Sequence, residues 1–201
     1  IDFIYNQVPN RLVPYDYQAL ARYPGKILAG VTNAYSGEAE YFGQEMAEPT
    51  FSILRASCAL PILFPPVLID GIPYYDGGLV DPIPVLKSIQ DGHEKNLIVL
   101  TREVEYQKHA SSREARLTAK LIQKKYPRIA MIIRERHIQY NRTVALCNQL
   151  EREGKAVLLR PTTATNVGRM EKDIVKLRRL YQAGYCDAEK RLSEIRKLFS
   201  H

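Results

Sequence analysis

The sequence Asp76-Gly77-Gly78 joins a carboxylate to two glycines within a proline-rich apolar stretch, residues 56–85. A carboxylate at the end of a strand can act as a general base or orient a reacting group, because neighbouring backbone fixes its geometry. The two glycines can turn the chain sharply and leave the Asp76 side chain uncrowded. Asp-Gly is also the commonest short hairpin signal, so the local spacing alone favours an ordinary turn.

A metal site and a cofactor site are not expected. Asp70, Asp76 and Asp81 do not have the spacing of an EF-hand loop, and no His or Glu lies among them. The glycines do not form a phosphate-binding loop. We therefore predict chemistry that needs neither a metal ion nor a cofactor.

A nucleophile is not evident in the chain. No two of the eleven glycines stand four residues apart around a serine, so the G-x-S-x-G nucleophile elbow is absent from the sequence. Ser57 and Cys58 have no base indicated beside them, and we expect small, buried, inert residues there. His137 shares the helical spacing of apolar residues, which predicts a core histidine with its hydrogen bonds satisfied.

A tight hairpin is expected to position the aspartate. Val67 to Ile69 is a short apolar strand, Asp70-Gly71 is a two-residue turn, and Ile72 to Tyr75 is the return strand that ends at Asp76. Pro73 removes a donor from the ladder, which favours an edge position for the return strand. The carboxylate would thus lie at a strand terminus.

Residues before this hairpin predict a second one and two short helices. A helix is expected after Asp16, and strands are expected over 26–33 and 38–42, joined by a turn at 35–37. Pro49 suits the first turn of a helix that reaches Ser57.

Residues after the hairpin are expected to be mainly helical. Pro84 begins a helix that ends at Asp91-Gly92, and the apolar run over 96–101 suits a parallel strand buried on both faces, with the helix as its crossover. Further elements follow from apolar spacing and breakers. They are a helix around 115–122 that ends or kinks at Pro127, a helix from Ile129 to Gly154, a strand from Ala156 to Leu159, a helix from Met170 broken at Gly184, and a final helix capped by Asp187.

Charge is distributed unevenly over the 201 residues. Residues 1–100 hold 6 Lys and Arg against 11 Asp and Glu, whereas residues 101–201 hold 23 against 11, so the halves carry −5 and +12. A basic half can bind anionic membrane or nucleic acid, although Glu interleaved at helical spacing favours a solvated surface. Three cysteines without a CxxC pair indicate a reducing, cytoplasmic compartment. No membrane span or signal peptide is visible.

In this order of elements, ASCALPILFPPVLIDGIPYYDGGLVDPIPV resembles the C-terminal portion of a bacterial patatin-like phospholipase. The Asp-Gly-Gly at 76–78 is similar to the motif that carries the catalytic aspartate of that family. The resemblance extends upstream through VTNAYSGEAEYF and downstream through DPIPV and NLIVLT. The segment with RRLYQAGYCDA resembles a C-terminal extension found on one bacterial branch of the family, so the resemblance covers nearly the whole chain.

The resemblance implies a three-layer α/β/α fold with a mainly parallel central sheet whose N-terminal strands are missing. Residues 1–104 would be the C-terminal part of the catalytic domain, and residues 105–201 a helix-rich extension with one short strand near 155–160. It also implies a Ser-Asp dyad and a glycine-rich oxyanion loop. Asp76 would be the dyad aspartate, with Gly77 and Gly78 supporting it.

The elbow serine and the oxyanion loop lie upstream of the aspartate in that family, and neither pattern occurs before Asp76. The start at Ile1 without a methionine agrees with a truncated piece of a lipid acyl hydrolase, which alone would be inactive. Expected partners are a lipid or ester substrate, an anionic membrane surface, and further copies bound through exposed sheet surface. The alternative is a non-enzymatic module that binds anionic membrane or nucleic acid, although no recognition motif supports nucleic acid.

Overall fold

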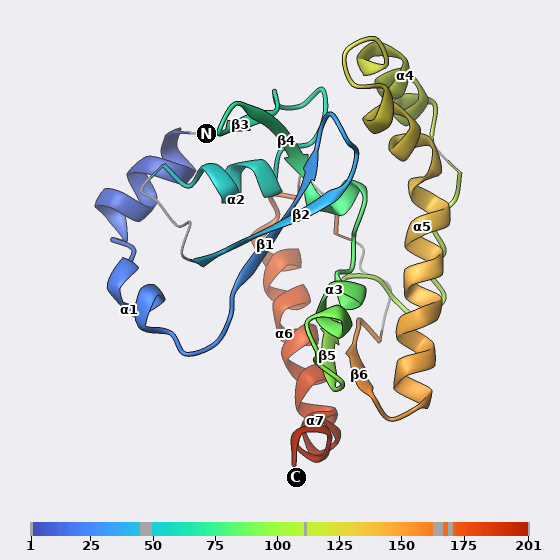
Figure 1. Ribbon diagram of the computed structural model, residues 1–201. Coiled ribbons are helices and arrows are strands. Elements are labelled where there is room, and N and C mark those ends of the chain that lie inside the picture. The colour runs from blue at the N-terminus through green and yellow to red at the C-terminus, as the bar shows by residue number, and fades with distance from the viewer. Residues whose placement is uncertain (1, 45–49, 111, 163–166, 169–170, 201) are drawn as a thin grey trace. The chain divides into compact units, whose positions relative to one another are not determined.

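The computed structural model describes residues 2–44, 50–110, 112–162, 167–168 and 171–200 as a mixed α/β protein (Figure 1). Contacts within the chain divide it into two compact units, residues 1–83 with 109–140, and residues 84–108 with 141–201. The predicted division at residue 104 remains a prediction. We call the two groups of residues unit 1 and unit 2 and describe each by itself.

Unit 1 contains four strands and helices from both ends of its sequence. Its elements are a π-helix η1 (Phe3–Leu12), α1 (Tyr17–Arg22), β1 (Leu28–Asn33), β2 (Ala39–Gly43), α2 (Ser52–Ser57), β3 (Val67–Ile69), β4 (Ile72–Asp76), the 3₁₀ turn η3 (Gly77–Leu79), α4 (Arg113–Ile122) and the first part of α5 (Pro127–Arg152). Both predicted hairpins are confirmed. The helix expected after Asp16 is also confirmed, because the Asp16 carboxylate accepts a hydrogen bond of 2.8 Å from the Ala19 N–H. Pro49, expected to begin α2, lies outside the described residues.

The sheet of unit 1 is antiparallel, with strand order β2-β1-β4-β3. The prediction of a mainly parallel sheet is therefore wrong for these four strands. For the β1–β2 and β3–β4 pairs the physical reason lies in the connections, because a short turn can join only antiparallel neighbours. β3 and β4 are joined by Asp70-Gly71, where both residues have positive φ, 49° and 78°, as a type I′ turn requires.

Pro73 lies in an interior strand, so the predicted edge position of β4 is wrong. β4 pairs with β1 on one side and with β3 on the other. The ladder with β1 covers only Tyr74 to Asp76, and the Pro73 carbonyl accepts a bond of 2.8 Å from the Ala34 N–H in the turn beyond β1. The ring therefore lies where the β1 ladder has ended, and no ladder donor is lost.

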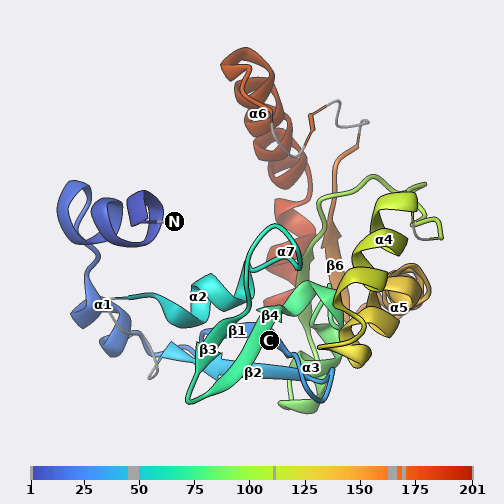
Figure 2. The ribbon, with the colours of Figure 1, turned by 90° about the horizontal axis from the view of Figure 1, so that it is seen from above.

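Neighbouring tyrosines of β4 enter two different hydrophobic clusters, because successive side chains of a strand point to opposite faces. Tyr74 packs with Val31 and with Ala56 of α2. Tyr75 packs with residues of α4 and α5, and its ring meets that of Tyr126 edge-on at 5.8 Å. Figures 1 and 2 show α2 and α5 on the two sides of β4. The β4 strand is thus held from both faces.

The described residues of unit 2 form a parallel strand pair and four helical segments. Its elements are α3 (Val85–Gln90), β5 (Asn96–Val99), the rest of α5, β6 (Ala156–Leu159), α6 (Ile174–Lys190) and α7 (Leu192–Phe199). β5 and β6 pair in parallel, as a connection through α5 allows. Two details correct the sequence analysis. Leu97 and Val99 are 40% and 69% exposed, so β5 is not buried on both faces, and the described part of β5 pairs with β6 alone.

The expected break at Gly184 is also wrong, because α6 continues through Gly184 and Asp187 to Lys190. Asp187 does not cap a new helix. Its carboxylate instead accepts hydrogen bonds from Thr162, at 2.8 Å from the hydroxyl and 3.2 Å from the N–H. A helical glycine lowers stability by only about 1 kcal/mol relative to alanine, so packing overrides it here.

Burial raises the pKa of Tyr75 from 10.0 to about 12. The folded chain thus favours the neutral phenol, and this stabilisation is fully present below pH 10 and lost as the pH rises through 12. Between pH 10 and pH 12 the unsubstituted chain should therefore lose about 2 to 3 kcal/mol of unfolding free energy through the Tyr75 phenol. Tyr75→Phe has no phenol at this position and should not show this loss. Urea unfolding followed by circular dichroism at about pH 9 and about pH 12 measures the difference. Tyr23→Phe is the control, because the Tyr23 ring is 53% exposed, and this variant should lose as much unfolding free energy at high pH as the unsubstituted chain. An equal loss in Tyr75→Phe would contradict the role given to the buried Tyr75 phenol.

Candidate functional site

The backbone of Asp76 is fixed where β4 ends. Its N–H donates to the Ala59 carbonyl at 2.9 Å, and its own carbonyl accepts a hydrogen bond of 2.8 Å from the Thr32 hydroxyl. Thr32 is fully buried on β1, so its hydroxyl makes this bond within the sheet. A buried hydroxyl without a partner would cost about 1 to 3 kcal/mol, which favours this one arrangement of the strand end.

Gly77 lies against the backbone of β1 with no room for a side chain. A Cβ atom at position 77 would stand 2.4 Å from the Gly30 carbonyl oxygen and 2.9 Å from the Val31 nitrogen. Such distances are far below van der Waals contact, and backbone atoms cannot rotate away as a flexible side chain can. The glycine is therefore needed for close approach, and the chain turns into η3 at that point.

The Asp76 carboxylate is held by one of its two oxygens. Oδ1 accepts a hydrogen bond of 2.8 Å from the Gly78 N–H. A Cβ atom at Gly78 would stand 3.1 Å from this oxygen, so a side chain there would crowd the carboxylate. No described residue donates a hydrogen bond to Oδ2. The geometry fixes the orientation of the carboxylate and leaves one oxygen for an incoming donor.

Arg136 of α5, which is 58 residues further along the chain than Gly78, binds the same turn. Its Nε donates to the Gly78 carbonyl at 2.9 Å, and its Nη2 would lie 3.6 Å from a Cβ atom at Gly78. Gly78 therefore donates its N–H to Asp76, and its carbonyl accepts a hydrogen bond from Arg136. Sequence reasoning missed this residue. The signal was an arginine at helical spacing from Ile129 and Ile133, both buried on α5.

Asp70 and Asp81, the two aspartates nearest to Asp76 in the sequence, are not part of the same site. Asp70 occupies the first position of the β3–β4 turn, with φ 49°. Asp81 accepts a hydrogen bond from the Tyr41 hydroxyl of β2, and its N–H donates to the Gly77 carbonyl at 2.9 Å. Within the described part of the chain, no group of three or more His, Cys, Asp or Glu side chains could hold a metal ion.

Ser57, Cys58 and His137 are not brought to Asp76 by any hydrogen bond in the described structure. Ser57 ends α2, and Cys58 is exposed, so the expectation of a buried cysteine is wrong. His137 follows Arg136 on α5. Its Nδ1 is buried without a hydrogen-bond partner among the described residues, so the expected satisfied histidine is wrong as well.

Two family models match the chain, and neither covers half of it. Residues 20–88 match the model of the patatin-like phospholipase family, and residues 126–200 match a domain of unknown function (DUF6363). The first match supports a patatin-like domain and contains Asp76, Gly77 and Gly78. The second contains Arg136, so the two residues that bond to Gly78, Asp76 and Arg136, lie in different matches. The search of curated proteins found no match.

Replacing Arg136 by methionine should loosen the turn after Asp76. The substitution keeps a side chain of similar length but removes the charged donor, and hydrogen bonds to charged groups contribute about 1.5 to 3 kcal/mol. Amide exchange measured by NMR at Val80 and Asp81, whose N–H groups bond to the Gly77 carbonyl, should become about tenfold faster or more. Arg134→Met is the matched control, because Arg134 lies on the same helix and bonds to Gln123 instead. Equal exchange rates in the two variants would contradict a role for Arg136 in holding the turn.

Proposed function

We propose that these residues are the aspartate-bearing part of a lipid acyl hydrolase, in which Asp76 is the aspartate of a Ser-Asp dyad. The observation that carries the proposal is the carboxylate itself. One oxygen is fixed by the Gly78 N–H at 2.8 Å, the other accepts no hydrogen bond from a described residue, and the whole turn lies within the patatin-like match. The three-layer arrangement remains a prediction, which the packing of α2 and α5 against successive tyrosines of β4 supports.

The proposed reaction uses Asp76 as a proton carrier. Oδ2 accepts the proton of a serine hydroxyl while the serine oxygen forms a bond to the ester carbonyl carbon. The ester C–O bond then breaks, and Asp76 returns the proton to the departing alkoxide. A water oxygen then bonds to the acyl carbon while Asp76 accepts a proton from that water, the bond between the acyl carbon and the serine oxygen breaks, and Asp76 returns the proton to the serine oxygen. The bond between Oδ1 and the Gly78 N–H keeps the second oxygen aimed at the serine throughout.

The serine of this dyad is proposed to come from outside the 201 residues, since the chain has no G-x-S-x-G. We therefore expect the chain alone to hydrolyse p-nitrophenyl esters no faster than the buffer. In a longer protein where these residues follow a serine elbow, Asp76→Asn should lower kcat by about 10²- to 10⁴-fold, because the amide cannot accept the proton. Asp70→Asn, in the β3–β4 turn, is the control and should keep the activity. Full activity of the Asp76→Asn protein, or robust turnover by the chain alone, would refute the assignment.

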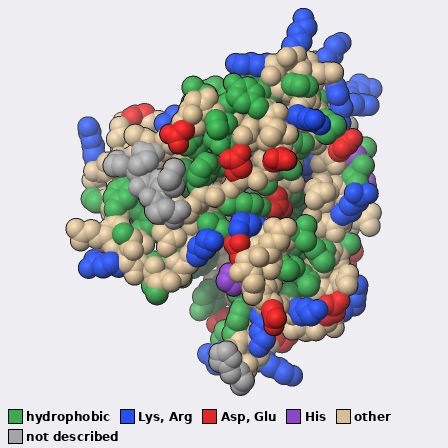
Figure 3. Space-filling model, in the orientation of Figure 1, with side chains coloured by type: hydrophobic (Ala, Val, Ile, Leu, Met, Phe, Trp, Pro, Cys, Tyr) green, Lys and Arg blue, Asp and Glu red, His purple; other side chains and the backbone are tan. Residues whose placement is uncertain are grey.

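Membrane association is the second part of the proposal, and α4 with the start of α5 carries it. Figure 3 shows Lys and Arg side chains gathered over this region. The six exposed basic residues are Arg113, Arg116, Lys120, Lys124, Lys125 and Arg128. Leu117 and Leu121 lie one turn apart among them and are 58% and 64% exposed. Basic residues around exposed leucines are typical of a helix that lies in the interface of an anionic membrane.

Vesicle sedimentation tests this surface, with phosphatidylcholine vesicles compared with vesicles that also contain phosphatidylserine. Each basic residue near an anionic surface contributes about 1 kcal/mol, so the double variant Lys120→Glu/Lys124→Glu should lose at least tenfold in affinity. Lys95→Glu/Lys197→Glu removes the same charge from exposed positions in unit 2 and should lose much less. Equal losses would show that net charge alone governs binding. None of the described helices has the length and apolar content needed to cross a membrane.

Self-association through exposed sheet surface also remains a prediction. Leu68 of the edge strand β3 is 66% exposed, and Val99 of β5 is 69% exposed. Exposed apolar residues on strands are typical of surfaces that pair with another chain. The cytoplasmic location stays a prediction from the cysteine count.

A further inference from the structure

Unit 2 contains a cavity of about 640 Å³ between its parallel strands and α6. This volume lies within the range of about 300 to 1,000 Å³ that small-molecule sites occupy. The last residues of β5 and β6, Val99 and Leu159, line the cavity, and so do the residues that follow them, Leu100 and Arg160. The carboxyl ends of parallel strands are where α/β proteins commonly bind ligands.

The middle of the α6 wall of the cavity is lined by the small residues Ala183 and Gly184. Leu180, Ala183, Gly184 and Asp187 recur at helical spacing and face the strands. A Cβ atom at Gly184 would have no atom within 4 Å, so the space beside this glycine is open. With Val99, Leu100 and Leu159 opposite, the interior is apolar.

Three basic residues, Arg160, Lys176 and Arg179, line the cavity with one acidic residue, Asp187. Asp187 accepts two hydrogen bonds from Thr162 and stands 3.8 Å from Lys190, so it is already bonded. Arg160 binds the neutral Asn148 at 2.7 Å, and Lys176 stands 3.4 Å from Glu171. Within the described structure, Arg179 has neither an ion pair nor a hydrogen bond. The cavity therefore holds more positive charge than its acidic groups neutralise.

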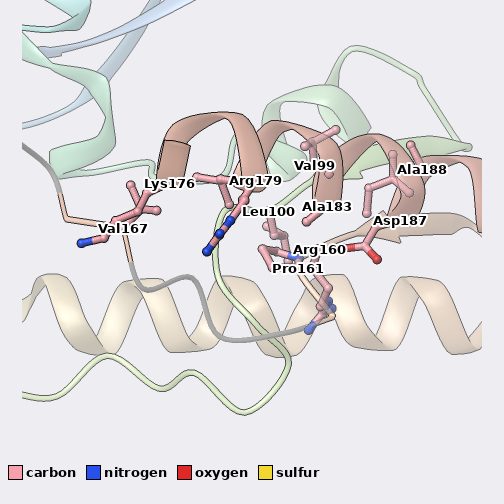
Figure 4. Close-up of a pocket in the computed structure, with 13 residues that line it drawn as sticks. Val99, Leu100, Arg160, Pro161, Val167, Lys176, Arg179, Ala183, Asp187 and Ala188 are labelled. Carbon is pink, nitrogen blue, oxygen red and sulfur yellow. The ribbon is translucent and has the colours of Figure 1, made fainter. Parts of the chain in front are cut away.

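Figure 4 shows that Lys176 and Arg179 both extend from α6 at one end of the cavity. The apolar residues Val99, Leu100 and Ala183 lie further along the cavity. Lys176 and Arg179 lie one helical turn apart, so both can reach one anionic group. A guanidinium binds a carboxylate or a phosphate through two parallel hydrogen bonds, which makes arginine well suited to this task. The cavity thus combines a cationic end with an apolar interior.

We infer that this cavity binds a single-chain anionic amphiphile, with its carboxylate or phosphate head on Arg179 and Lys176 and its alkyl chain between α6 and the β5–β6 pair. The nearest simple ligand of this class is a long-chain fatty acid. The inference does not rest on the proposed ester hydrolysis, because its residues lie outside residues 20–88. It gives a binding role to part of the region matched only by a domain of unknown function.

Isothermal titration calorimetry of the chain with myristate, below its micelle concentration, tests the site. Arg179→Glu should weaken binding by tenfold or more, because a charged hydrogen bond is replaced by repulsion. Arg178→Glu is the matched control, since Arg178 is exposed, adjacent on α6, and does not line the cavity. Equal weakening by the two substitutions would overturn the inference in favour of general surface charge.

A second pair of variants tests the apolar part without removing charge. Gly184→Leu should fill the cavity and weaken myristate binding by about tenfold or more, while Gly184→Ala adds one methyl group and should keep most of the affinity. Both changes favour the helix, so loss of folding is not expected, and circular dichroism checks it. Unchanged affinity in Gly184→Leu would overturn the location of the alkyl chain.

The choice of ligands separates the head group from the chain. Dodecyl phosphate should bind as a member of the same class. Acetate, which has the head group alone, and dodecyltrimethylammonium, which has a cationic head, should not bind measurably. Binding of either one as tightly as myristate, or no binding of both myristate and dodecyl phosphate, would overturn the inference.

Discussion

The close approach of Gly77 to the backbone of β1 is the constraint on which the candidate site depends. With 2.4 Å between the Gly30 carbonyl and any added Cβ atom, only glycine permits β4 to turn into η3 there. The turn presents the Gly78 N–H to the Asp76 carboxylate and the Gly78 carbonyl to Arg136. Gly78 is thus held through its N–H and through its carbonyl, which lie in successive peptide groups, and the bond from its N–H fixes the orientation of the carboxylate.

Local features of the site were predictable because they depend on short-range chemistry. Asp70-Gly71 specifies a tight turn whatever surrounds it, so both strands of that hairpin and the place of Asp76 at its end could be predicted. Asp16 likewise caps its helix through its own side chain. The patatin-like resemblance rested on the order of these local elements, and it agrees with the family match over residues 20–88.

Long-range features were not predictable in the same way. A run such as Asn96 to Thr101 specifies a strand, but its partner and its covered faces depend on residues far away, here β6. Gly184 shows the same limit, since helix propensity is a weak preference that tertiary packing overrides. Arg136 was missed because its partner is a backbone carbonyl 58 residues away, and a carbonyl leaves no trace in the sequence.

Tyr75 and Arg136 also bear on how such a protein could have been assembled from parts. Tyr75 belongs to the patatin-like match, yet its hydrophobic cluster also contains Tyr126, Ile129 and Ile133, which belong to the other match. A chain cut between the matches would leave a tyrosine ring and the Gly78 carbonyl in water. The two matched segments therefore share one hydrophobic cluster and one hydrogen bond in unit 1, and neither segment can make these contacts without the other.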